Sequence, residues 1–108
     1  MIKLTRSTDM TDFGFYQAKV TFTTTSDWIY MQSGNPTISA AIHPTGGTAK
    51  VQYTLSSSAD IEAGNGRWID WDKGANSVAT ADSLIGSVVA VRGVNVTATS
   101  SVIEVVAQ

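Results

Sequence analysis

The most constraining feature of this 108-residue chain is a repeated alternation of apolar and polar residues with a period of two. Ala, Val, Tyr and Leu alternate with Lys, Gln and Thr over residues 49–55, and the same pattern runs from Tyr16 to Phe22. A period of two is typical of β-strands, because successive side chains point to opposite faces. We expect almost no helix, since no window of about a dozen residues carries apolar side chains at helical spacing.

Turn residues divide the chain into short strands. The segment His43-Pro44-Thr45-Gly46-Gly47 separates apolar runs at 37–42 and 49–55, which predicts a β-hairpin. Residues 97–100 likewise separate the last two valine-rich runs, which we expect to form a closing hairpin. The pattern indicates a two-sheet sandwich or a small barrel. We predict an all-β, single-domain β-sandwich, immunoglobulin-like or jelly-roll-like, with about seven short antiparallel strands.

Composition narrows the classes of function. The chain has one His and no Cys, so the side chains used in nucleophilic, acid–base and zinc chemistry are nearly lacking. A net charge of -2, with Lys and Arg scattered singly, argues against nucleic acid as a partner. The N-terminus resembles no signal peptide, and the longest apolar run is too short to span a bilayer. We expect a non-enzymatic protein made in a cytoplasm, without cofactor, metal or membrane contact.

The segment 68–74, Trp-Ile-Asp-Trp-Asp-Lys-Gly, is chemically denser than the rest of the chain. Trp68 and Trp71 are three residues apart, so on a strand their rings face opposite sides and do not stack on one sugar. We expect Trp68 to fill the core and Trp71 to lie at a loop or rim. Asp72 and Lys73 are then exposed beside Trp71 as contact residues.

Two further readings of this segment have weaker support. Asp70 and Asp72 share a strand face but lack the additional oxygen ligands of a calcium site and the separation across a cleft that a glycosidase pair needs. Exposed aromatic side chains on a sandwich could instead stack on a glycan, and core packing explains at least two of them more simply. The four aromatic candidates are Trp28, Tyr30, Trp68 and Trp71.

Three charged or titratable residues stand out along the strands. His43 lies in the predicted hairpin turn without a nucleophile or second His at usable spacing, so we expect a solvated turn residue. Arg92 interrupts a valine-rich strand and must either lie at an edge or find a carboxylate. If the last two strands form a hairpin, Glu104 lies close enough for an ion pair with Arg92.

The first fifteen residues are set apart from the sandwich domain at 16–108. This segment, 1–15, carries more apolar side chains than a solvated tail needs. Its spacing of Ile2 and Leu4 suits either an arm that adds to a neighbour or a first edge strand of the same sandwich. Phe13 and Phe15 join Trp71, Asp72 and Lys73 as the candidates for contact with a partner.

Three segments of the second half resemble a known family. They are 51–57 (Val-Gln-Tyr-Thr-Leu-Ser-Ser), 68–74 and 86–92 (Gly-Ser-Val-Val-Ala-Val-Arg), followed by an alternating valine strand. Over residues 49–108 the chain is similar to small all-β virion proteins of tailed bacteriophages. The resemblance implies a capsid decoration, or cement, protein on the capsid surface of the virion. Such a protein binds the major capsid protein and copies of itself as a homo-oligomer and stabilises the shell.

Two alternatives to the decoration role stay open. The leading one is another position in the virion, in the head–tail region or the tail fibre. The second is a carbohydrate-binding β-sandwich module, for which a glycan is the partner.

Overall fold

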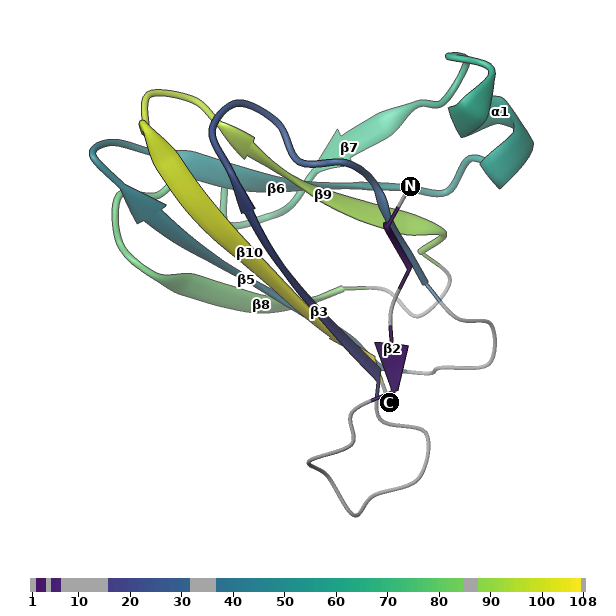
Figure 1. Ribbon diagram of the computed structural model, residues 1–108, viewed down its shortest axis with the longest axis horizontal. Coiled ribbons are helices and arrows are strands. Elements are labelled where there is room, and N and C mark those ends of the chain that lie inside the picture. Colours follow the sequence, from purple (N-terminus) through teal and green to yellow (C-terminus); the bar gives the residue numbers. More distant parts are fainter. Residues whose placement is uncertain (1, 4, 7–15, 32–36, 85–87, 108) are drawn as a thin grey trace.

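The computed structural model describes residues 2–3, 5–6, 16–31, 37–84 and 88–107. They form two five-stranded sheets that pack face to face (Figure 1), which confirms the predicted all-β sandwich. The described residues hold ten strands where the sequence predicted about seven, because strands of two or three residues are too short to show alternation. No helix among the described residues is long and apolar enough to cross a membrane.

Sheet A has the strand order β1-β4-β9-β6-β7, and sheet B has the order β2-β3-β10-β5-β8. Sheet A consists of β1 (Ile2–Lys3), β4 (Ile29–Tyr30), β9 (Ala90–Asn95), β6 (Ala49–Thr54) and β7 (Trp68–Asp70). Sheet B consists of β2 (Thr5–Arg6), β3 (Tyr16–Phe22), β10 (Ser100–Ala107), β5 (Ile38–Thr45) and β8 (Thr80–Leu84). One short helix, α1 (Ser58–Glu62), joins β6 to β7. Strands β1 and β4 pair in parallel, and the other described pairs are antiparallel.

Both predicted hairpins are wrong, because each turn carries the chain from one sheet to the other. β5 pairs with β10 and β8 in sheet B, while β6 pairs with β9 and β7 in sheet A. The last turn likewise joins β9 of sheet A to β10 of sheet B, as Figure 1 shows. A turn between sheets uses the same glycines and small hydroxyl residues as a hairpin. The alternation on either side also looks the same in both cases.

The two crossing turns are fastened to each other. The carbonyl of Thr48 accepts hydrogen bonds from the N–H groups of residues 96, 97 and 98 at 2.9 to 3.0 Å. The Thr48 N–H donates in return to the hydroxyl of Thr97 at 2.8 Å. Gly47 has a φ of 155°, and a Cβ there would lie 2.5 Å from the Thr97 carbonyl carbon. Only glycine therefore fits this close approach, which fixes the spacing of the sheets at one end.

The core lies between the sheets, and on β6 it follows the predicted alternation. On β6, Val51 is fully buried while Lys50 reaches the surface, and on β10 Ile103 and Val105 point inward. The buried apolar residues come from both sheets: Phe22, Ile29, Ile38, Ala40, Ile42, Ala49, Val51, Trp71, Val88, Val91, Ile103, Val105 and Ala107. This period of two decides which side chains of each strand remain on the outer faces.

The N-terminal residues contribute one short strand to the edge of each sheet. The backbone of Ile2 pairs with Ile29 of β4, and that of Thr5 pairs with Gln17 of β3. Residues 2–3 and 5–6 therefore have the pairings expected of edge strands. The partner-contact candidates Phe13 and Phe15 lie outside the described residues.

Candidate functional site: an aromatic–arginine face

A row of polar side chains crosses the outer face of sheet A. Asp70 of β7 and Arg92 of β9 are the two cross-strand neighbours of Gln52 on β6. Val51 and Val91 on the same strands are buried between the sheets, so the residues that follow them point outward. The register alone therefore brings together three residues that are 18 and 40 positions apart in the chain.

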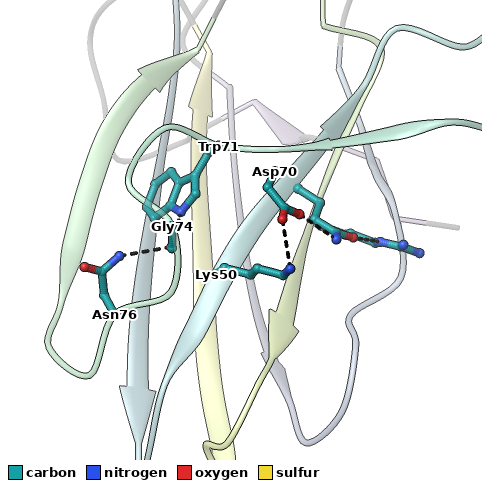
Figure 2. Close-up of polar contacts among 7 residues, drawn as sticks. Lys50, Asp70, Trp71, Gly74 and Asn76 are labelled. Carbon is teal, nitrogen blue, oxygen red and sulfur yellow. Dashed lines mark hydrogen bonds and ion pairs between the residues drawn. The ribbon is translucent and has the colours of Figure 1, made fainter.

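The row is connected by hydrogen bonds along its whole length. Arg92 donates its Nε–H to Gln52 Oε1 at 2.9 Å, and Gln52 donates Nε2 to Asp70 Oδ1 at 2.8 Å. Lys50 then donates Nζ to Asp70 Oδ2 at 3.0 Å (Figure 2). The hydrogen bond from Gln52, and after it the one from Lys50, holds the pKa of Asp70 below its ordinary value. Both oxygens of this carboxylate are thus engaged, and Gln52 is fixed in one orientation.

Two indole rings enclose the guanidinium at the end of this row. The Cζ atom of Arg92 lies 4.3 Å from the ring centroid of Trp28 and 4.7 Å from that of Trp68. These distances are within the range of cation–π contacts, in which the face of the ring attracts the cation. Burial lowers the pKa of Arg92 from its ordinary value.

The predicted ion pair between Arg92 and Glu104 is wrong. Arg92 belongs to sheet A and Glu104 to the central strand of sheet B, so the two side chains lie on different outer faces. Glu104 instead pairs with His43 Nε2 at 2.9 Å. His43 accordingly lies on β5 and not in a turn. Arg92 lies neither at a sheet edge nor against a carboxylate, because β9 is the central strand of sheet A and its partners are the Gln52 amide and two indole rings.

The predicted environments of Trp68 and Trp71 are reversed. Trp71 is 2% exposed and belongs to the core, whereas Trp68 is 55% exposed on the outer face. The reason is register. The Trp71 N–H donates to the carbonyl oxygen of Val51 at 3.0 Å, so Trp71 lies beside an inward-facing residue. The two rings do face opposite sides, as their spacing predicts. Because its ring is buried, Trp71 presents no surface to a partner in this structure.

The turn after β7 holds the buried indole in place. Trp71 donates Nε1–H to the carbonyl of Gly74 at 2.7 Å, and Figure 2 shows its ring directed toward that residue. Asn76 donates its amide to the same carbonyl at 3.1 Å, and its backbone pairs with Ala49. Asp72 and Lys73 occupy this turn and are exposed, as predicted. Asp72 therefore does not share a strand with Asp70, and the described residues contain no cluster of three metal-binding side chains.

A second outer row extends the face toward the helix. Tyr30 of β4 pairs with Ala90, which pairs with Thr54, which in turn pairs with Trp68. Burial, and after it the charge of Glu62 on α1, raises the pKa of Tyr30. We use the name aromatic–arginine face for five side chains of the two rows together with Trp28, which contacts Arg92: Trp28, Tyr30, Gln52, Trp68, Asp70 and Arg92.

A hollow of about 260 Å³ lies beside Trp68 and is lined by Gly66, Arg67 and Trp68. Two hydrogen bonds hold the backbone of Arg67 at this hollow. The Arg67 N–H donates to the hydroxyl of Ser56 at 3.0 Å, and the Thr54 hydroxyl donates to the Arg67 carbonyl. Sequence reasoning missed this arrangement because Trp28, Trp68 and Arg92 meet only through the pairing of β4, β9, β6 and β7.

No family model matches the chain, and no curated protein sequence is significantly similar to it. One similar solved structure comes from a study of the mechanism of oxalate oxidase, at 16% sequence identity and a TM-score of 0.47. The similarity covers 87% of this chain and 41% of that one, so this chain spans less than half of that protein.

Proposed function

We propose that this domain is a non-enzymatic structural protein of a tailed-bacteriophage virion, in the role of a capsid decoration protein. It binds the major capsid protein and copies of itself on the outside of the shell. The proposal is supported by the resemblance of residues 49–108 to small all-β virion proteins. Other positions in the virion, at the head–tail junction or in the tail fibre, are consistent with the same resemblance.

The observation that favours a contact function is an exposed apolar strand edge. Leu55 and Ile69, at the end of β6 and on β7, are 50% and 46% exposed. The backbone N–H of Trp71 donates to Val51 on β6. Because backbone groups alternate in direction along an antiparallel strand, the N–H and C=O groups of Trp68 and Asp70 point away from β6. No described strand pairs with β7 on that side. An apolar edge with free hydrogen-bonding groups suits strand addition by a partner.

Capsid binding provides the test. Expanded capsids that carry the protein should break at a higher temperature than capsids that lack it. Ile69→Lys should weaken binding by about 1–2 kcal/mol, or roughly tenfold, because it places a charge on a half-exposed residue of the edge strand. Binding is measured by cosedimentation, and circular dichroism verifies that the variant is folded.

Val96→Lys is the matched control. Val96 is also an exposed apolar residue, but it lies beyond the opposite end of the β6–β9 pair. It should bind capsids like the wild type. Capsids whose breakage temperature is unchanged by the protein would contradict the decoration role, and recovery with purified tails would favour the head–tail or tail-fibre position.

A further inference from the structure

We propose that the aromatic–arginine face and the hollow beside it bind an acidic sugar, a pyranose ring that carries a carboxylate. The ring packs on the free face of Trp68, and the carboxylate pairs with Arg67. This inference does not depend on the position of the protein in a virion.

The structure removes the geometric objection to an aromatic platform. That objection concerned Trp68 and Trp71, which do face opposite sides of sheet A. Trp28 and Trp68, by contrast, both contact the same guanidinium on the outer side. Of the four aromatic candidates, Trp71 lies in the core and Trp68 is exposed, while Trp28 and Tyr30 are partly buried.

Trp68 is held ready for a planar ligand. Arg92 covers one face of its indole, which leaves the opposite face for a ligand. Arg92 is in turn held by Gln52, whose amide is fixed by Asp70. A ring fixed before binding loses little conformational freedom when a ligand arrives, which favours affinity. Arg92 thus serves as a positioning residue for Trp68.

The cation that lines the hollow is Arg67. Arg67 and Arg92 form no ion pair with any residue in the described part of the chain, whereas Asp70 is paired with Lys50. Two carboxylates, Asp60 and Glu62, lie on the neighbouring helix α1, where neither forms an ion pair with Arg67. A guanidinium binds a carboxylate through two parallel hydrogen bonds, a geometry that neutral hydroxyl groups do not match.

The size of the hollow agrees with a small ligand. It is open to solvent and lined by three consecutive residues, and its volume of about 260 Å³ is smaller than that of an enclosing pocket, about 300–1,000 Å³. One sugar unit can enter while the rest of a glycan chain extends over the exposed outer face.

The experiment is a titration of the full chain by tryptophan fluorescence and calorimetry. The probes are uronic-acid and sialic-acid oligosaccharides, their methyl esters, and neutral oligosaccharides of the same length. We expect saturable binding of at least one carboxylated probe. Its methyl ester should bind at least about tenfold more weakly, because the ester keeps the sugar ring and removes the charge. Equal binding of acid and ester, or binding of no carboxylated probe, would overturn the proposal.

Variants separate this site from a merely folded domain. Trp68→Ala should abolish binding, and Arg67→Gln should reduce binding of the acid to the level of the ester. Lys19→Gln is the matched control, because it removes one positive charge from an exposed residue on β3 of sheet B. Unchanged binding by Trp68→Ala would overturn the proposal. If the wild type binds no glycan and Trp68→Ala loses capsid binding, the proposal is also overturned, and the face is assigned to a protein partner.

Discussion

Trp68 and Trp71 are three residues apart, yet they occupy opposite sides of sheet A. The outer ring contacts Arg92 and is mostly exposed, while the inner ring packs in the core and bonds to Gly74. The comparison teaches that residue type does not assign a tryptophan to core or surface at the edge of a sheet. Register does, because Trp71 stands beside the inward-facing Val51.

The largest effect is expected when each of the two indole rings is truncated in turn, which tests whether they occupy different environments. Trp71→Ala should lower the free energy of unfolding by about 3–5 kcal/mol, because it leaves a cavity in the core. Trp68→Ala should cost about 1 kcal/mol or less, since it removes mainly a cation–π contact. Urea unfolding of both variants measures the difference. Equal losses would mean that the two rings do not occupy different environments.

The same contrast can be sharpened on β9, where Gly93 faces inward and Val94 outward. A Cβ at Gly93 would lie 2.4 Å from Cζ of Phe22, a ring buried in the core. Gly93→Ala should therefore cost about 1–3 kcal/mol through overpacking, and Val94→Ala should cost less than about 1 kcal/mol. Calorimetric melting of the two variants supplies the measurement.

A double variant tests the cause of the Gly93 effect. Phe22→Leu shortens the side chain that a new methyl group would meet. In its presence Gly93→Ala should cost less than it does alone, because residues in contact are not additive. Strict additivity would show that the loss has another origin.

The smallest effect concerns pH on the outer side. Folding lowers the pKa of Asp70, so its stabilisation is present above the ordinary carboxyl pKa of about 3.9 and is lost as pH falls through the lower, folded value. The stability difference between wild type and Asp70→Asn should shrink on acidification and stay below about 1 kcal/mol throughout, because the carboxylate is half exposed.

Asp72→Asn provides the charge-matched control for this measurement, because it removes one exposed carboxylate from the neighbouring turn. Urea unfolding at a series of pH values would compare the three proteins. A difference for Asp70→Asn that grows on acidification would contradict the hydrogen-bonded row.

Much of the fold was predictable, and the site was not. Alternation correctly placed Val51 in the core and Lys50 outside, but on the last strand the structure buries Ile103 and Val105 and not the apolar residues on the face of Glu104. The turn glycines Gly46 and Gly47 and the turn residues 97–99 were correctly located, but residues 43–45 belong to β5, and both turns join strands of different sheets. The wrong strand pairing also gave a wrong prediction at the site, because the expected hairpin put Arg92 beside Glu104, which lies in the other sheet.

The sequence by itself determined the β-class of this protein and the buried face of β3, β5 and β6, because a period of two is a property of the local backbone. The tertiary structure decided which strands pair, which tryptophan is exposed and which side chains surround Arg92. Those outcomes depend on contacts between residues tens of positions apart. A short turn rich in glycine and threonine permits either a hairpin or a crossing between sheets, and only the packing of the whole domain selects one.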